Sequence, residues 1–123
     1  MEMYKPIYNY KYLENLWIEK YLKFIRKHKD KLAWDSISAN SLITWQIIEE
    51  NNDLPWDYNG ISYNPNITLD IVKKNKDKPW DWRNLSFNEG IKWEDILKNP
   101  DEDWDYNEIS RRVSYDIIKD NIV

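Results

Sequence analysis

The sequence predicts an all-helical repeat protein: a short solenoid of helix pairs behind a helical N-terminal cap. Three observations lead to this prediction. The dipeptide Trp-Asp recurs four times at a nearly constant interval of roughly 24 residues, a periodicity typical of solenoids and arrays. In each copy an apolar segment follows whose first residues suit a helix start. Helices this short are marginal in water, so the copies must stabilise one another by stacking.

The chain divides into a cap and four repeats within a single expected domain. The cap covers residues 1–33, and the repeats cover residues 34–55, 56–79, 80–103 and 104–123. The cap holds eight Lys or Arg against four Asp or Glu, whereas the repeats hold ten against eighteen. A basic segment suits an acidic partner, or is simply a solvated helix face. The candidate basic patch comprises Lys20, Lys23, Arg26, Lys27, Lys29 and Lys31.

Within the cap we expect one or two longer helices. Residues 21–30 parallel residues 68–77, which indicates a divergent half-copy before the first full repeat. The first full copy lacks two residues of its Trp-Asp segment, and the fourth lacks two residues of its turn. The sequence ends at Val123, directly after the last predicted helix, which leaves that face without a polar cap, so we expect either truncation there or a partner that covers this face.

The Trp-Asp segment predicts a short α or 3-10 helix. Pro55 and Pro79 precede the Trp, where a missing N–H costs least, and the Asp adds negative charge at the positive end of the helix. The repeated Trp is expected to fill the space between short helices. The predicted structural core is Trp34, Trp56, Trp80 and Trp104.

The second segment of each repeat predicts a helix of about ten residues. Thr44, Thr68 and Ser114 stand where an N-cap hydroxyl belongs, and the flanking apolar residues have hydrophobic-staple spacing. Each helix is expected to end at an Asn, a residue tolerated at helix C-termini. The four terminating residues are Asn51, Asn75, Asn99 and Asn121.

Few residues in the sequence are of the types and spacings that form catalytic or metal-binding sites. We therefore expect no enzyme, no catalytic residue, no cofactor and no metal. There is no Cys, and two Gly cannot form a phosphate-cradling loop. The single histidine, His28, lacks a catalytic constellation. Asp101, Asp103 and Asp105 alternate like the start of a calcium loop, but the Gly and the closing Glu that such a loop requires are missing.

Aromatic residues at positions that vary between copies are the candidate interaction surface. Residues in register on a solenoid form stripes, and an exposed aromatic stripe is a binding surface, whereas a buried one is core. The candidates are Tyr58, Trp82, Tyr106, Trp45, Trp93 and Tyr115.

Two repeating blocks carry a family resemblance. Asn-Pro-Asn-Ile-Thr and Pro-Trp-Asp-Trp, both within residues 64–82, recur in varied form at the right spacing over residues 34–123. They resemble the tryptophan-rich repeat of giant DNA viruses of the mimivirus kind. The layout is also similar to leucine-rich variant repeats, in which α and 3-10 helices alternate. The resemblance implies a helical repeat architecture and a viral source, in the virion or the host cytoplasm, but no activity.

We expect a non-enzymatic module that binds another protein. The N-terminus lacks the apolar run of a signal peptide and no stretch is long enough to span a bilayer, so the protein is expected to be soluble and intracellular, with no membrane partner. Two alternatives are single-stranded nucleic acid or glycan binding on an aromatic stripe, and a homo-oligomer formed through the C-terminal face. The acidic repeat region disfavours nucleic acid, because affinity there comes largely from neutralising phosphates.

Overall fold

The computed structural model describes the backbone of residues 10–120 and the side chains of residues 10–112 and 114. This part of the chain forms eight α-helices and one 3-10 helix and contains no strand, which confirms the all-helical prediction. Contacts divide the chain into two compact units, Met1–Leu32 and Ala33–Val123, where the sequence led us to expect a single domain. No helix in the described range is long and apolar enough to cross a membrane.

The first unit contains one long helix, α1 (Tyr10–Lys27), and the 3-10 helix η1 (Lys29–Lys31). No Pro or Gly interrupts residues 10–27. The positive charges of Arg26 and Lys27 in the last turn interact favourably with the negative end of the helix dipole. Trp17 and Tyr21 lie one turn apart with their rings stacked at 4.5 Å. The half-copy expected over residues 21–30 is therefore the end of a continuous helix and its 3-10 extension.

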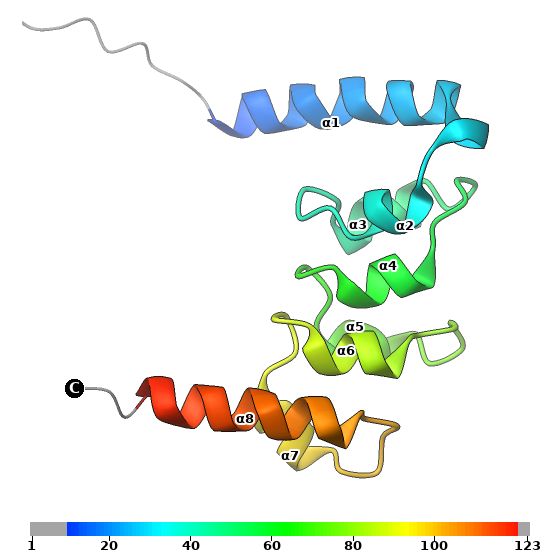
Figure 1. The fold of residues 1–123 in the computed structure, drawn as a ribbon. Coiled ribbons are helices and arrows are strands. Elements are labelled where there is room, and N and C mark those ends of the chain that lie inside the picture. The colour runs from blue at the N-terminus through cyan, green and yellow to red at the C-terminus, as the bar shows by residue number, and fades with distance from the viewer. Residues whose placement is uncertain (1–9, 121–123) are drawn as a thin grey trace, which may run out of the picture. The chain divides into compact units, whose positions relative to one another are not determined.

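The second unit contains seven helices within residues 33–120, the part of it that the structure describes. They are α2 (Trp34–Ser38), α3 (Trp45–Glu50), α4 (Tyr58–Tyr63), α5 (Leu69–Lys74), α6 (Trp82–Phe87), α7 (Trp93–Lys98) and α8 (Tyr106–Asp120). Within this unit α2 packs on α4, α4 on α6 and α6 on α8, so that repeats contact their neighbours in chain order (Figure 1). The second helix of each repeat is six residues long in α3, α5 and α7, shorter than the expected ten.

Both ends of these second helices have a local cause. The Thr44 and Thr68 hydroxyls accept hydrogen bonds from Ile47 N and Ile71 N, which confirms both predicted N-caps. At the other end the Asn51 side chain donates to Ile47 O at 2.9 Å, and Asn75 and Asn99 make the same bond one and two repeats later. The Asn amide satisfies a terminal carbonyl in place of a continued helix, so the helix stops after six residues.

The Trp-Asp dipeptide lies just before the first helix of a repeat. Asp57 is the N-cap of α4, and its carboxylate accepts a hydrogen bond from Asn59 N at 2.8 Å. Asp81 caps α6 by accepting a hydrogen bond from Asn84 N at 3.0 Å. The Asp therefore stands at the positive end of the helix, as expected, and also acts by a direct hydrogen bond, whereas Trp56 and Pro55 lie before the helix instead of at its start.

The first repeat is in register with the others, contrary to the expectation that it lacks two residues. The hydroxyls of Ser38 and Ser62 accept from Asp57 N and Asp81 N, and Ser86 continues the series one repeat later. With Ser38 equivalent to Ser62, Trp34 stands where α4 begins, at Tyr58. Its Trp-Asp dipeptide is thus shifted along the repeat, and Ala33 at the N-cap position makes no side-chain bond.

The fourth repeat differs in its helices. The sequence predicted a turn and a new helix capped by Ser114, but α8 runs unbroken from Tyr106 to Asp120. Arg112 stands where the second and third repeats have Asn64 and Asn88, and its guanidinium donates to Ser86 O at 3.2 Å and also to Ile91 O. The long side chain reaches these carbonyls from within a helix, so no turn is required. Asn121, the expected helix end, lies outside the described residues.

The core of the second unit is aliphatic. Ile43, Ile61, Ile67, Leu85 and Ile91 are completely buried, and burying one such side chain stabilises the fold by about 1.5–3 kcal/mol. Of the four Trp residues predicted as core, Trp80 and Trp104 are buried, whereas Trp34 and Trp56 are only half-buried. The branched aliphatic side chains fit between closely stacked short helices, and the larger indoles lie at the margin of that core.

Candidate functional site

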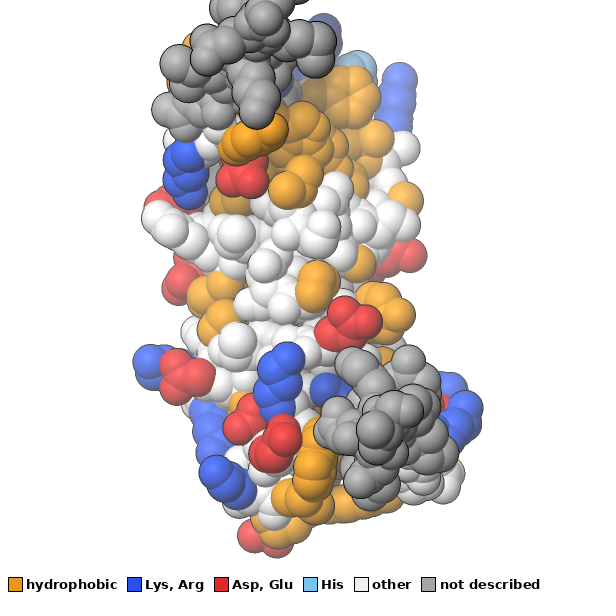
Figure 2. Space-filling view, turned by 90° about the vertical axis from the view of Figure 1, so that its left-hand side faces the viewer, with side chains coloured by type: hydrophobic (Ala, Val, Ile, Leu, Met, Phe, Trp, Pro, Cys, Tyr) orange, Lys and Arg blue, Asp and Glu red, His pale blue; other side chains and the backbone are white. Residues whose placement is uncertain are grey.

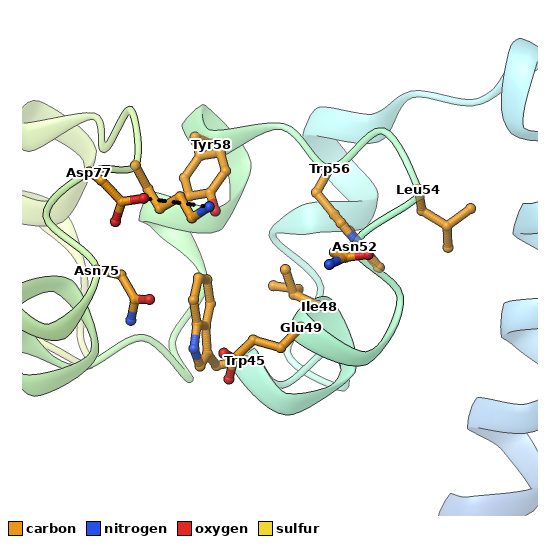
Figure 3. A pocket seen from close by; sticks show the side chains of 10 residues that line it. Trp45, Ile48, Glu49, Asn52, Leu54, Trp56, Tyr58, Asn75 and Asp77 are labelled. Carbon is orange, nitrogen blue, oxygen red and sulfur yellow. Dashed lines mark ion pairs between the residues drawn. The ribbon is translucent and has the colours of Figure 1, made fainter.

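A pocket of about 430 Å³ lies between the first two repeats of the second unit, and we call it the aromatic pocket. Its volume is in the range of small-ligand sites. Figure 3 shows Trp45, Trp56 and Tyr58 around the same space, with Glu49 beside Trp45 and Asp77 on the side of Tyr58. The lining consists of Trp45, Ile48, Glu49, Asn52, Leu54, Trp56, Tyr58, Asn75, Asp77 and Lys78.

A buried indole behind the pocket positions two of its walls. Trp80 is buried, and its indole N–H donates to Asn75 O at 2.7 Å. The ring of Tyr58 meets Trp80 edge to face at 5.3 Å, and the ring of Trp45 lies 5.6 Å from it at 37°. The opposite wall is held similarly, because the Trp56 indole N–H donates to Asn51 O at 2.9 Å. The aromatic walls are therefore preorganised.

The pocket carries an excess of negative charge. Burial, followed by the charges of Asp77 and Glu49, raises the pKa of the Tyr58 phenol above its ordinary value of 10.0. Lys78 forms an ion pair with Asp77 at 3.8 Å, drawn as the dashed line in Figure 3. Within the described residues no ion pair involves Glu49.

We expect the Tyr58 phenol to titrate above pH 10.0 in the folded protein. Because its folded-state pKa is raised, the stabilisation contributed by the neutral phenol is complete below the unfolded pKa and is lost as the pH rises through the folded pKa. NMR titration of ¹³Cζ-labelled tyrosine, assigned with Tyr58→Phe, measures this pKa. Replacing Glu49 by Gln and Asp77 by Asn should lower it, with burial retaining part of the shift. A pKa at or below 10.0 in the wild-type protein would contradict the assignment.

The equivalent space between the next two repeats is bridged by direct bonds. Lys76 occupies the position of Asn52 in the following repeat, and its ammonium forms an ion pair with Glu102 at 3.0 Å. Lys73, equivalent to Glu49, donates to the Asn99 side chain. In the aromatic pocket the same positions make no such bridge among the described residues. The pocket thus depends on side chains that differ between repeats.

The structure brings two of the predicted surface aromatics, Trp45 and Tyr58, into one pocket. Trp82 is half-buried and packs edge to face on Trp104 at 5.0 Å, and Trp93 is also half-buried. Tyr106 is 56% exposed, and its hydroxyl donates to Pro100 O at 2.7 Å. The side chain of the sixth candidate, Tyr115, lies outside the described set.

Sequence reasoning missed the polar lining and one aromatic wall. Trp56 was assigned to the core, yet it lines the pocket, and Glu49, Asn52, Asp77 and Lys78 were not singled out. A signal existed for two of them. One repeat further along the chain, Glu49 is replaced by Lys73 and Lys78 by Glu102, so the charge is reversed from one repeat to the next.

A second aromatic surface, also missed, lies on the turns that follow α4 and α6. Tyr63 and Phe87, which are equivalent residues of successive repeats, are 56% and 40% exposed. With Pro65, Asn88 and Glu89 they line a smaller cavity of about 200 Å³. The buried polar group at this cavity, the Asn88 amide, is already bonded to Ser62 O and Asn64 O, and the cavity is smaller, so the aromatic pocket is the better candidate.

The remaining candidates are placed without forming a chemical site. All six residues of the basic patch are exposed on α1 and η1, and Lys23 pairs loosely with Glu19 at 3.9 Å. The His28 ring packs against Phe24 at 4.8 Å. Asp105 caps α8 through Asn107 N at 3.1 Å. In the described range no group of three or more His, Asp or Glu could hold a metal ion.

The charges of the second unit are mixed in sign. Figure 2 shows Lys and Arg side chains interspersed with Asp and Glu toward the lower end of the face it draws. The mixed signs on this face differ from the continuous positive groove that tracks a nucleic-acid backbone.

Comparison of the chain with protein-family models, with curated proteins and with solved structures finds no match in any of the three.

Proposed function

We propose that the protein is a non-enzymatic repeat module that binds another protein, and that a segment of the partner enters the aromatic pocket. The observation that carries this proposal is the difference between neighbouring repeats. In a purely structural array, inter-repeat contacts such as the Lys76–Glu102 and Lys73–Asn99 bonds would recur between every pair of neighbouring repeats. Between the first two repeats those bonds are replaced by an open pocket with three aromatic walls.

The character of the walls supports a protein ligand. Trp and Tyr dominate the energetic centres of protein interfaces, because they bury a large area and lose little conformational entropy. The three wall residues are only half-buried, so part of each ring remains for a partner to cover. The resemblance to tryptophan-rich repeats of giant DNA viruses supports a viral source, in which case the partner would be a viral or host protein.

Peptide-display selection on the immobilised full-length protein tests the proposal. The matched variant is Glu49→Lys/Asn52→Lys/Lys78→Glu, which places the bridging residues of the next pair of repeats at the equivalent exposed positions. We expect selected peptides to bind the wild-type protein at least about tenfold more tightly than this variant, a difference of roughly 1.4 kcal/mol.

Asp70→Asn is the control, because it makes the same net change in charge outside the pocket and should not alter binding. Circular dichroism checks that all three proteins are folded. A selection that enriches no peptide would overturn the proposal, as would selected peptides that bind the bridged variant as tightly as the wild-type protein.

A further inference from the structure

We propose that the aromatic pocket selects a cationic side chain, Lys or Arg, of the bound segment. This inference rests on the proposed function and specifies its ligand. It is carried by the juxtaposition of Trp45, Trp56 and Tyr58 with two carboxylates, Glu49 and Asp77, around one opening.

The aromatic walls suit a cation because the face of an aromatic ring is negative. A Lys or Arg group within about 6 Å of the ring centroid is attracted to that face, most strongly for Trp. Two of the three walls are Trp, and the rings of Trp45 and Tyr58 are fixed by their contacts with Trp80 at 5.6 and 5.3 Å. A ligand cation would therefore meet aromatic rings that need not reorganise.

The carboxylates add negative electrostatic potential to that of the aromatic ring faces. Both Asp77 and Glu49 act on the Tyr58 hydroxyl, which shows that their charges are felt at the wall of the pocket. Glu49 projects from α3 beside Trp45, whereas Asp77 follows α5, so the two carboxylates approach from different repeats (Figure 3). An ammonium or guanidinium group between them would interact with both.

Lys78 is the competing charge, and it is a weak competitor. Its ammonium lies 3.8 Å from the Asp77 carboxylate, and the two side chains are 44% and 77% exposed. Exposed pairs at such a distance contribute little, because water and salt screen them. A ligand cation can therefore displace Lys78 from Asp77, and Glu49 has no described ion pair to break.

The test uses acetylated and amidated pentapeptides, Gly-Gly-X-Gly-Gly, in which X is Lys, Arg, norleucine or Glu. Binding to the full-length protein is followed by ¹⁵N NMR of the indole N–H groups of Trp45 and Trp56. We expect the Lys and Arg peptides to bind at least about tenfold more tightly than norleucine, which has the same aliphatic stem without the charge. The Glu peptide should bind most weakly.

Three variants have effects that a merely structural role would not produce. Glu49→Gln/Asp77→Asn should lower the ratio of Lys to norleucine affinity at least about threefold, and Lys78→Gln should raise it. Trp45→Leu, which introduces the residue found at Leu69 in the next repeat, should weaken the Lys peptide. Asp70→Asn, which removes one carboxylate charge from an exposed part of α5 outside the pocket, should leave the ratio unchanged.

Equal affinity for the Lys and norleucine peptides would overturn the inference, and so would the absence of binding of every peptide at millimolar concentration. Neither result decides the outcome of the peptide-display selection, because a selected partner can also use surfaces beyond the pocket. Selected peptides that depend on the pocket but carry no Lys or Arg would overturn the charge selectivity while leaving protein binding supported.

Discussion

Asn64→Ala is expected to lower the free energy of unfolding by about 3–4 kcal/mol, because it removes four hydrogen bonds made by a completely buried side chain. The Asn64 side chain is completely buried, and its amide donates to the carbonyls of Ser38, Asn40 and Ile43 at 2.9, 3.1 and 2.9 Å. Its side-chain oxygen accepts from Asn66 N at 2.9 Å. One residue thus satisfies three carbonyls of the preceding repeat and closes its own turn.

Urea unfolding followed by circular dichroism measures this change. Asn59→Ala is the matched control, since Asn59 is exposed and only its backbone groups are hydrogen-bonded, so a change below about 0.5 kcal/mol is expected. Asn88→Ala removes two buried bonds, to Ser62 O and Asn64 O, and should have an intermediate effect. An Asn64→Ala protein as stable as the Asn59→Ala protein would contradict the stabilising role of these buried Asn hydrogen bonds.

Gly60→Ala is expected to destabilise the protein by about 2–3 kcal/mol through overpacking. A Cβ at this position would lie 2.1 Å from Asp35 O and 2.9 Å from the Cβ of Ser38, so α4 would have to move away from α2. No described Gly has a positive φ, so backbone strain is not the cause. The sign is informative, because Gly→Ala within an exposed helix ordinarily stabilises by about 0.5–1 kcal/mol.

The control is the equivalent position one repeat later. Asn84 already carries a side chain there, and its amide donates to Asn59 O at 2.9 Å. Asn84→Ala should therefore cost only about 1 kcal/mol, the value of one partly exposed hydrogen bond. The same urea titration compares the two variants. A Gly60→Ala protein more stable than wild type would refute the close approach of the two helices.

Local signals explain what could be predicted about the helices. The Thr44 and Thr68 caps act on backbone groups three residues away, and the Asn residues at helix ends act over four residues. Such interactions are encoded within a few positions of the chain, so their spacing in the sequence identified helix starts and ends. The predicted N-cap and C-terminal Asn positions leave room for only six helical residues between them, so the expected length of about ten was too long.

Most of the expectations that proved wrong concern features that are set by contacts between repeats. The Trp-Asp motif suggested a gap in the first repeat, but the Ser38–Asp57 bond sets the register, and Trp34 instead occupies the position of Tyr58. Similarly, nothing local to Arg112 indicates that its guanidinium would reach carbonyls 26 and 21 residues earlier. These bonds join segments that are distant in sequence and adjacent only after stacking.

The sequence by itself determined that this protein is helical and repetitive, because its periodicity, caps and turns are properties of short stretches of chain. The tertiary structure decided which repeated residues form the core and which form a surface. Trp80 and Trp56 occupy equivalent positions, yet Trp80 is buried behind Trp45 and Tyr58 while Trp56 lines the aromatic pocket. The difference arises from the adjacent repeat, which leaves an open pocket beside Trp56 and bridges the equivalent space one repeat later by direct bonds. It therefore exists only once the repeats are stacked.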